Sequence, residues 1–138
     1  RPKTIITADY VAKSRKAKTY TYMFTWRSPI NKGSVHGNEL NFCFNTLERA
    51  GNELPQPTEQ DYELADIMSS VWAQFAKTGN PNIKELPKWK AYTAKNGEMM
   101  IFDYNCEIRN NPDRKLEEII DRHCFKQLDE FRKKQAGK

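Results

Sequence analysis

The sequence feature that most constrains the fold is a short stretch, Thr19 to Trp26, in which aromatic residues alternate with other side chains. The alternating aromatic positions are Tyr20, Tyr22, Phe24 and Trp26. Successive side chains of a strand point to opposite faces, so this pattern of β-branched and aromatic residues predicts a strand over 19–26 with one aromatic face.

A long amphipathic helix is predicted over 58–78. Thr58 is suited to the N-cap with Asp61 three residues later, and Gly79 followed by Pro81 is a typical stop signal. The apolar face at helical spacing consists of Leu64, Ile67, Met68, Val71, Trp72 and Phe75. These side chains are interpreted as core packing, with no further role.

The remainder of the chain adds few further elements. Two strands are predicted within 98–110, the first with Met99 to Phe102 buried on both faces, and a terminal helix is predicted over 113–134. Residues 8–18 are interpreted as the end of a helix with a basic exposed face. The pattern is mixed α and β, and its strands are too few to close a sheet by themselves. We therefore expect an incomplete α/β fold.

Charge and composition argue against two classes of partner. The chain has 23 Lys and Arg against 18 Asp and Glu, a net charge of +5. The basic residues are mostly scattered and do not alternate with aromatic residues as in a platform for stacked bases, so no nucleic acid is expected as a partner. The longest apolar runs span only a few residues, so no membrane is expected either.

The three cysteines, Cys43, Cys106 and Cys124, are odd in number and lack C-x-x-C spacing. They make a poor disulfide framework and a poor zinc site. His123, beside Cys124 on a periodic helix, is assigned a structural role because adjacent residues cannot share a helix face as ligands. We expect no metal and no cofactor. Together with the lack of an N-x-S/T sequon, the cysteines favour the cytoplasm and leave secretion open.

The most informative motif begins at His36, near the end of a polar loop at 27–37. By default, a lone histidine in such a loop is a surface or hydrogen-bonded residue. Here, however, residues 36–44 read H-x-x-E-L-x-F-x-F, residues 72–82 read W-x-x-F-A-x-x-G-x-P-N, and residues 86–92 contain W-K-x-Y. In this order and spacing the motifs resemble the type-B carboxylesterases, the cholinesterase and para-nitrobenzyl esterase family, whose third motif is usually W-P-x-Y.

The resemblance implies the C-terminal part of an α/β-hydrolase fold, in which the catalytic triad follows the chain order serine, acid, histidine. His36 would be the general base, because an imidazole can accept the serine proton and return it to the leaving alcohol near neutral pH. No G-x-S-x-G and no HGGG-type loop occurs in the sequence, and no methionine precedes Arg1. We therefore expect residues 1–138 to be the C-terminal segment of a serine carboxylesterase catalytic domain, inactive alone.

The same resemblance assigns roles to the neighbours of His36. Glu39 matches the glutamate of H-x-x-E and is interpreted as a supporting residue for the loop, not as the triad acid. Phe42 and Phe44 are candidates either for the acyl pocket or for packing beneath the histidine loop. Ser34 lacks the strained strand-to-helix turn of a nucleophile, and Cys43, if buried, behaves as a small hydrophobe.

Two alternatives stay open at this point. One is a non-catalytic relative, an adhesion or scaffold protein on the same fold, and the other is a free-standing basic binding domain. For the esterase, the expected partners are a small-molecule ester and the N-terminal part of the same protein. Because a segment of a larger sheet has strand edges that are paired in the whole protein, the isolated chain is expected to self-associate, for example along 20–26.

Overall fold

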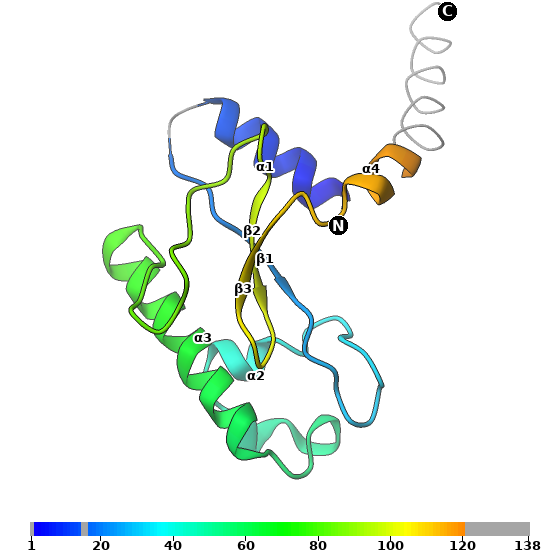
Figure 1. Ribbon diagram of the computed structural model, residues 1–138. Helices are drawn as coiled ribbons and strands as arrows, with labels where there is room; N and C mark the ends of the chain where they lie inside the picture. Colours follow the sequence, from blue (N-terminus) through cyan, green and yellow to red (C-terminus); the bar gives the residue numbers. More distant parts are fainter. Residues whose placement is uncertain (1, 15–16, 121–138) are drawn as a thin grey trace, which may run out of the picture.

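The computed structural model describes residues 2–14 and 17–120, which form a small mixed sheet with helices packed around it (Figure 1). In chain order the elements are α1 (Pro2–Ser14), β1 (Thr21–Phe24), α2 (Leu40–Cys43), the 3-10 turns η1 (Leu47–Arg49) and η2 (Gly51–Glu53), α3 (Glu59–Thr78), β2 (Glu98–Phe102), β3 (Glu107–Asn110) and α4 (Arg114–Ile120). No helix within these ranges is both long enough and apolar enough to cross a membrane.

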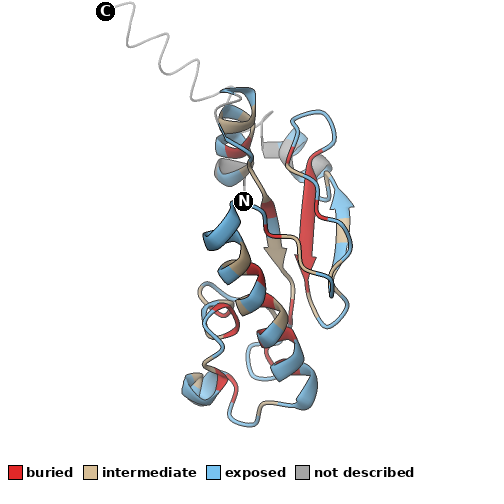
Figure 2. Ribbon diagram, turned by 90° about the vertical axis from the view of Figure 1, so that its left-hand side faces the viewer, coloured by how far each residue is buried: buried red, intermediate tan, exposed pale blue. Residues whose placement is uncertain are grey.

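The sheet has the strand order β1-β2-β3. β1 lies parallel to β2, with Thr21 beside Met99 and Phe24 beside Phe102, and β2 and β3 form an antiparallel hairpin. All five residues of β2 are buried, including the run from Met99 to Phe102 as predicted, and this strand lies between β1 and β3 (Figure 2). Parallel strands need a long crossover, and the segment that contains α2 and α3 provides it.

The predicted strands all form, but each is shorter than the sequence pattern indicated. The predicted strand 19–26 is a regular strand only from Thr21 to Phe24, although Thr25 still donates its N–H to the carbonyl of Phe102 at 2.9 Å. β2 ends at Phe102 because the chain then turns at Asp103, whose carboxylate accepts the backbone N–H of Tyr104 at 2.9 Å.

The helix α3 packs against two residues of the predicted aromatic face, Tyr20 and Tyr22. Tyr22 packs edge-on against Trp72 of α3, with ring centroids 5.0 Å apart. Trp72 in turn lies 5.8 Å from the ring of Phe102 on β2. Residues from α2, α3 and the sheet form one hydrophobic core, whose buried members include Trp26, Phe42, Leu64, Met68, Met100 and Phe102. This core positions the segment that follows β1.

The predicted boundaries of α3 are confirmed at both ends. Thr58 accepts the N–H of Asp61 on its hydroxyl, Asp61 accepts the N–H of Thr58 at 2.8 Å, and the pair forms a complete capping box. At the other end Gly79 adopts a left-handed conformation with φ +70°. Both signals are local, so they could be identified in the sequence.

The two end regions of the chain were predicted less fully. α1 begins at Pro2 and ends at Ser14, so residues 17 and 18 of the expected helix end are not helical. The hydroxyl of Tyr92 donates to Asp9 at 2.8 Å and ties α1 to the segment before β2. α4, Arg114–Ile120, corresponds to the beginning of the terminal helix that was predicted over 113–134. The later residues of that prediction, including His123 and Cys124, lie outside the described residues.

Gly97 provides a test of the loop before β2. It has φ +59°, and a Cβ atom at this position would lie 1.7 Å from Oδ1 of Asn111. We expect Gly97→Ala to lower the free energy of unfolding by about 2–3 kcal/mol, through backbone strain and displacement of Asn111. The control is Gly51→Ala, which also has positive φ but no atom within 4 Å of the added Cβ. Urea denaturation of both variants measures the two losses of unfolding free energy. Equal losses would show that the clash with Asn111 contributes nothing.

Two buried carboxylates should make the fold sensitive to acid. Burial alone would raise the pKa of Asp61, but hydrogen bonds from Thr58, Tyr104 and Trp26 outweigh it and lower that pKa. Burial also opposes ionisation of Glu98, and hydrogen bonds that include those from Asn96 and Thr93 again lower its pKa. A lowered folded-state pKa gives stabilisation that is complete above the ordinary carboxyl pKa, about 4, and is lost as the pH falls through the folded-state value.

Asp61→Asn should therefore remove part of this acid sensitivity. We expect the variant to be clearly less stable than the wild type at pH 7, with a difference that shrinks steadily below about pH 4. Urea midpoints measured at intervals from pH 2 to pH 7 check this result. A difference in stability that stays constant over the whole range would show that the charge of Asp61 contributes nothing.

Candidate active site

His36 lies on an exposed loop that leaves the end of β1 and leads into α2. Within the part of the chain that the structure describes, no side chain forms a hydrogen bond with its imidazole ring. Gly37 follows it with φ +86°, a conformation that favours glycine, and this bend turns the chain towards Asn38 and α2. The ring is therefore presented at the surface on a sharply bent segment.

The loop is held by three side chains that are short and polar. Ser28 is 1% exposed, accepts the N–H groups of Ile30 and Asn31 at 3.2 Å each, and donates to the carbonyl of Glu53 at 3.1 Å. Ser34 donates its hydroxyl to the carbonyl of Trp26. Asn38, also buried, accepts the N–H of Val35 at 3.1 Å. These bonds tie the exposed loop to the end of the strand segment at Trp26 and to the η2 turn at Glu53.

Glu39 is half-buried and precedes the first turn of α2. It makes no side-chain cap bond to that helix, but its charge acts on Cys43 and Tyr22. Burial and the carboxylate of Glu39 together raise the pKa of Cys43 to about 11. Cys43 is also buried, which is the setting in which a thiol packs as a small hydrophobe.

The two phenylalanines of the motif lie in different surroundings. Phe42 is 2% exposed, and its ring packs 5.0 Å from that of Trp26 and 5.2 Å from that of Phe24. It packs in the core beneath the histidine loop, which was one of the two roles considered for it. Phe44 is 72% exposed, so its side chain faces outward on the far side of α2 from the core. Its role as an acyl-pocket residue stays a prediction.

A groove of about 750 Å³ runs along β1, from α1 to the histidine loop. Its lining includes Thr4 of α1, Met23 of β1, and His36 and Glu39 of the motif. Among the described residues β1 pairs only with β2, so the other edge of β1 is open here. His36 and Glu39 thus line the same groove at one end of this open strand edge.

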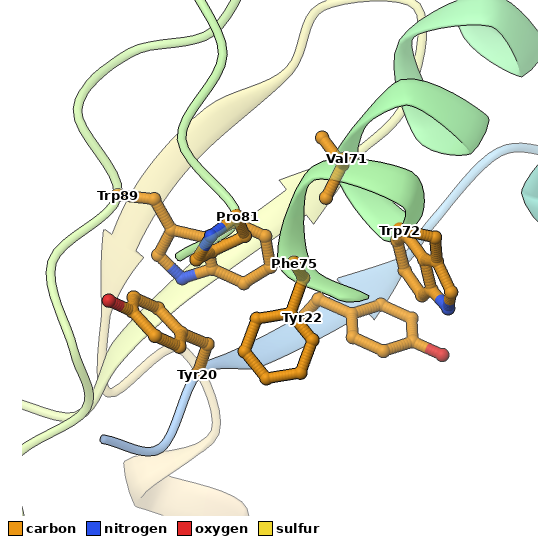
Figure 3. Close-up of a pocket in the computed structure, with 7 residues that line it drawn as sticks. All are labelled: Tyr20, Tyr22, Val71, Trp72, Phe75, Pro81 and Trp89. Atoms are coloured by element: carbon orange, nitrogen blue, oxygen red, sulfur yellow. The ribbon is translucent and has the colours of Figure 1, made fainter. Parts of the chain in front are cut away.

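A second, smaller hollow of about 200 Å³ lies between β1 and α3 (Figure 3). It is lined by Tyr20, Tyr22, Val71, Trp72, Phe75, Pro81 and Trp89. These residues offer aromatic and aliphatic surface but no carboxylate, imidazole or thiol, so the hollow is not suited to proton transfer. Across the described residues, no group of three His, Cys, Asp or Glu side chains lies close enough to hold a metal ion.

Comparison with known proteins identifies the family. The sequence profile of the carboxylesterase family matches residues 2–119. The chain belongs to the carboxylesterase family. It is 35% identical over 108 residues to the para-nitrobenzyl esterase of Bacillus subtilis, an alignment covering 74% of this chain and 21% of that protein. It is 31% identical over 118 residues to the bile salt-activated lipase of Rattus norvegicus, covering 78% of this chain and 18% of the lipase.

Solved structures of carboxylesterases confirm the predicted fold class, part of an α/β-hydrolase fold. An esterase from Clostridium hathewayi, described as hydrolysing aliphatic aromatic polyesters, matches with a TM-score of 0.72 and 27% identity. That match covers 81% of this chain and 22% of the esterase. A carboxylesterase of Geobacillus stearothermophilus matches with a TM-score of 0.68 and 30% identity, covering 79% and 23%. The chain thus spans about a fifth of the length of the carboxylesterases it matches.

Proposed function

We propose that this chain is the C-terminal segment of a serine carboxylesterase and that His36 is its general base. In this proposal the serine, the triad acid and the oxyanion-hole donors belong to the preceding part of the same protein. His36 takes the proton of the serine hydroxyl as it attacks the ester carbonyl and then returns it to the leaving alcohol. Glu39 supports the loop, and Phe44 is available to contact the acyl group or the preceding part of the protein. No metal or cofactor takes part.

The observation that carries the proposal is the setting of His36. Its ring is exposed and has no hydrogen-bond partner in the described residues, while the loop beneath it is fixed by Ser28, Ser34 and Asn38. A general base needs this combination of a fixed backbone and a ring free to bind groups from elsewhere. The ring also lies on the groove beside the open edge of β1, where a preceding strand of the same protein would pair.

The proposal is tested by hydrolysis of a short-chain aryl ester. We expect the full-length gene product to be active and the isolated chain to be inert, because two triad members and the oxyanion donors are missing from it. A folded but inactive full-length protein would favour the adhesion or scaffold alternative instead. Turnover by the isolated chain that depends on His36 would contradict the assignment of the nucleophile to the preceding part. We also propose a cytoplasmic location, from the odd number of cysteines and the lack of an N-x-S/T sequon.

We also propose that the isolated chain self-associates through β1. Thr25 directs its N–H towards β2, so by alternation the backbone groups of Tyr22 and Phe24 face the open edge. A lysine on such an edge blocks strand pairing between molecules. Tyr22→Lys should therefore shift the isolated chain towards monomer in sedimentation velocity. The matched control is Tyr62→Lys on α3, since both tyrosines are 38% exposed. A compact monomer for the unmodified chain at all concentrations would refute this proposal.

A further inference from the structure

Asp61 accepts more hydrogen bonds than a helix cap requires. Its Oδ2 atom accepts the backbone N–H and the hydroxyl of Thr58 at 2.8 and 2.7 Å, which completes the cap of α3. Its Oδ1 atom accepts a different pair, the indole N–H of Trp26 at 2.8 Å and the hydroxyl of Tyr104 at 2.9 Å. The residue is 1% exposed, so water does not compete for these bonds. The two oxygens therefore serve two separate purposes.

Trp26 connects Asp61 to the histidine loop. It is the last residue before that loop and is 1% exposed. Its backbone carbonyl accepts the hydroxyl of Ser34, two residues before His36. Its indole ring packs on Phe42, which follows the loop in α2, with ring centroids 5.0 Å apart. Trp26 thus contacts the chain both before His36, at Ser34, and after it, at Phe42 of α2, and Asp61 fixes the orientation of its ring.

We infer that Asp61 is a positioning residue for His36, acting through Trp26 and Ser34. This inference rests on the proposed function, because it gives Asp61 a part in placing the general base. The carboxylate fixes the indole, the indole fixes the backbone at Trp26, and the carbonyl of Trp26 anchors Ser34. Displacing a catalytic group by about 1 Å lowers the rate on the order of 100-fold. A residue remote from the reacting atoms can therefore change the rate by this factor if it sets the position of the catalytic group.

The negative charge of Asp61 is central to this network. Four donors converge on its two oxygens, and charge-assisted hydrogen bonds are roughly twice as strong as neutral ones. An asparagine at this position has nearly the same shape, but one of its two terminal atoms is itself a donor. Asp61→Asn therefore cannot satisfy both Thr58 and Trp26, and it breaks the network without creating a cavity.

The first test measures steady-state hydrolysis of an aryl ester by the full-length gene product. We expect Asp61→Asn to lower kcat by about 10- to 100-fold with little change in KM, because the base is misplaced while the substrate pocket is unchanged. The matched control is Glu98→Gln, which replaces another buried carboxylate, bonded to Thr93 and Asn96 at the opposite end of β2. This control should keep kcat near the wild-type value.

Ser34→Ala supplies the second arm of this test. It removes the hydroxyl that joins the loop to Trp26, so it should lower kcat in the same direction as Asp61→Asn. If both residues act through one chain of contacts, the double variant should lose no more than the worse single variant. Fully additive losses, or an equal loss of kcat in Glu98→Gln, would overturn the inference.

A spectroscopic measurement separates this inference from the proposed function. The ring signals of His36 can be assigned in isotope-labelled full-length protein by their disappearance in His36→Gln. Asp61→Asn and Ser34→Ala should both shift these signals, and Glu98→Gln should not. If the wild-type protein has no esterase activity, the proposed function fails, but shifted His36 signals would still support the positioning by Asp61. Signals that are unchanged in Asp61→Asn would overturn it.

Discussion

Replacing His36 with alanine should lower kcat/KM of the full-length gene product for a short-chain aryl ester by roughly 10⁴- to 10⁶-fold. In the proposed mechanism, loss of the imidazole leaves no group to take the proton of the serine hydroxyl as it attacks the ester carbonyl. The members of a triad act as a unit, so the loss of one removes most of the catalysis that all of them provide. Initial rates over a range of substrate concentrations give kcat and KM separately, and the loss should lie mainly in kcat.

The control for this experiment lies on the same loop. Asn31 is exposed, and the contact it makes with Ser28 uses only its backbone N–H, so Asn31→Ala should leave the rate within about twofold of wild type. Both variants should also unfold at the same denaturant concentration as the wild type, because neither side chain is buried. A loss of less than tenfold in His36→Ala would show that this histidine is not the general base.

Replacing Phe102 with alanine should lower the free energy of unfolding by about 4 kcal/mol. Phe102 has no exposed surface, and it lies where the sheet and α3 meet. Its ring centroid is 5.8 Å from those of Tyr22 and Trp72 and 5.9 Å from that of Trp89. The smaller side chain would leave a cavity between the sheet and α3. A loss of this size is a large part of the 5–15 kcal/mol that is typical of a domain.

Phe44 provides the matched control for this substitution. It is a phenylalanine of the same chain but 72% exposed, so Phe44→Ala should change the free energy of unfolding by no more than about 0.5 kcal/mol. Urea denaturation at pH 7 followed by tryptophan fluorescence measures both variants. Similar losses for the two substitutions would mean that the region around Phe102 is not the core. Separately, esterase assays of Phe44→Ala in the full-length protein would show whether Phe44 contacts the acyl group.

The sequence alone determined the features that depend on neighbouring residues. The alternation of aromatic residues around Tyr22 specified a strand and the side chains that share a face of it, because side-chain direction in a strand depends only on position. The capping box at Thr58 and the stop at Gly79 specified the length of α3 to within one residue, since both involve contacts over a few positions. The family was likewise identifiable, because its motifs are short and keep their order and spacing.

Only the tertiary structure decided how these parts combine around His36. The indole N–H of Trp26 binds Asp61 across 35 positions of sequence, and nothing in the local pattern of either residue distinguishes this bond from an ordinary cap. The different surroundings of Phe42 and Phe44, two positions apart, also depended on the turn of α2 between them. Strand pairing and side-chain burial are set by contacts between distant segments, so the groove beside β1 and the support of the histidine loop emerge only when the chain is folded.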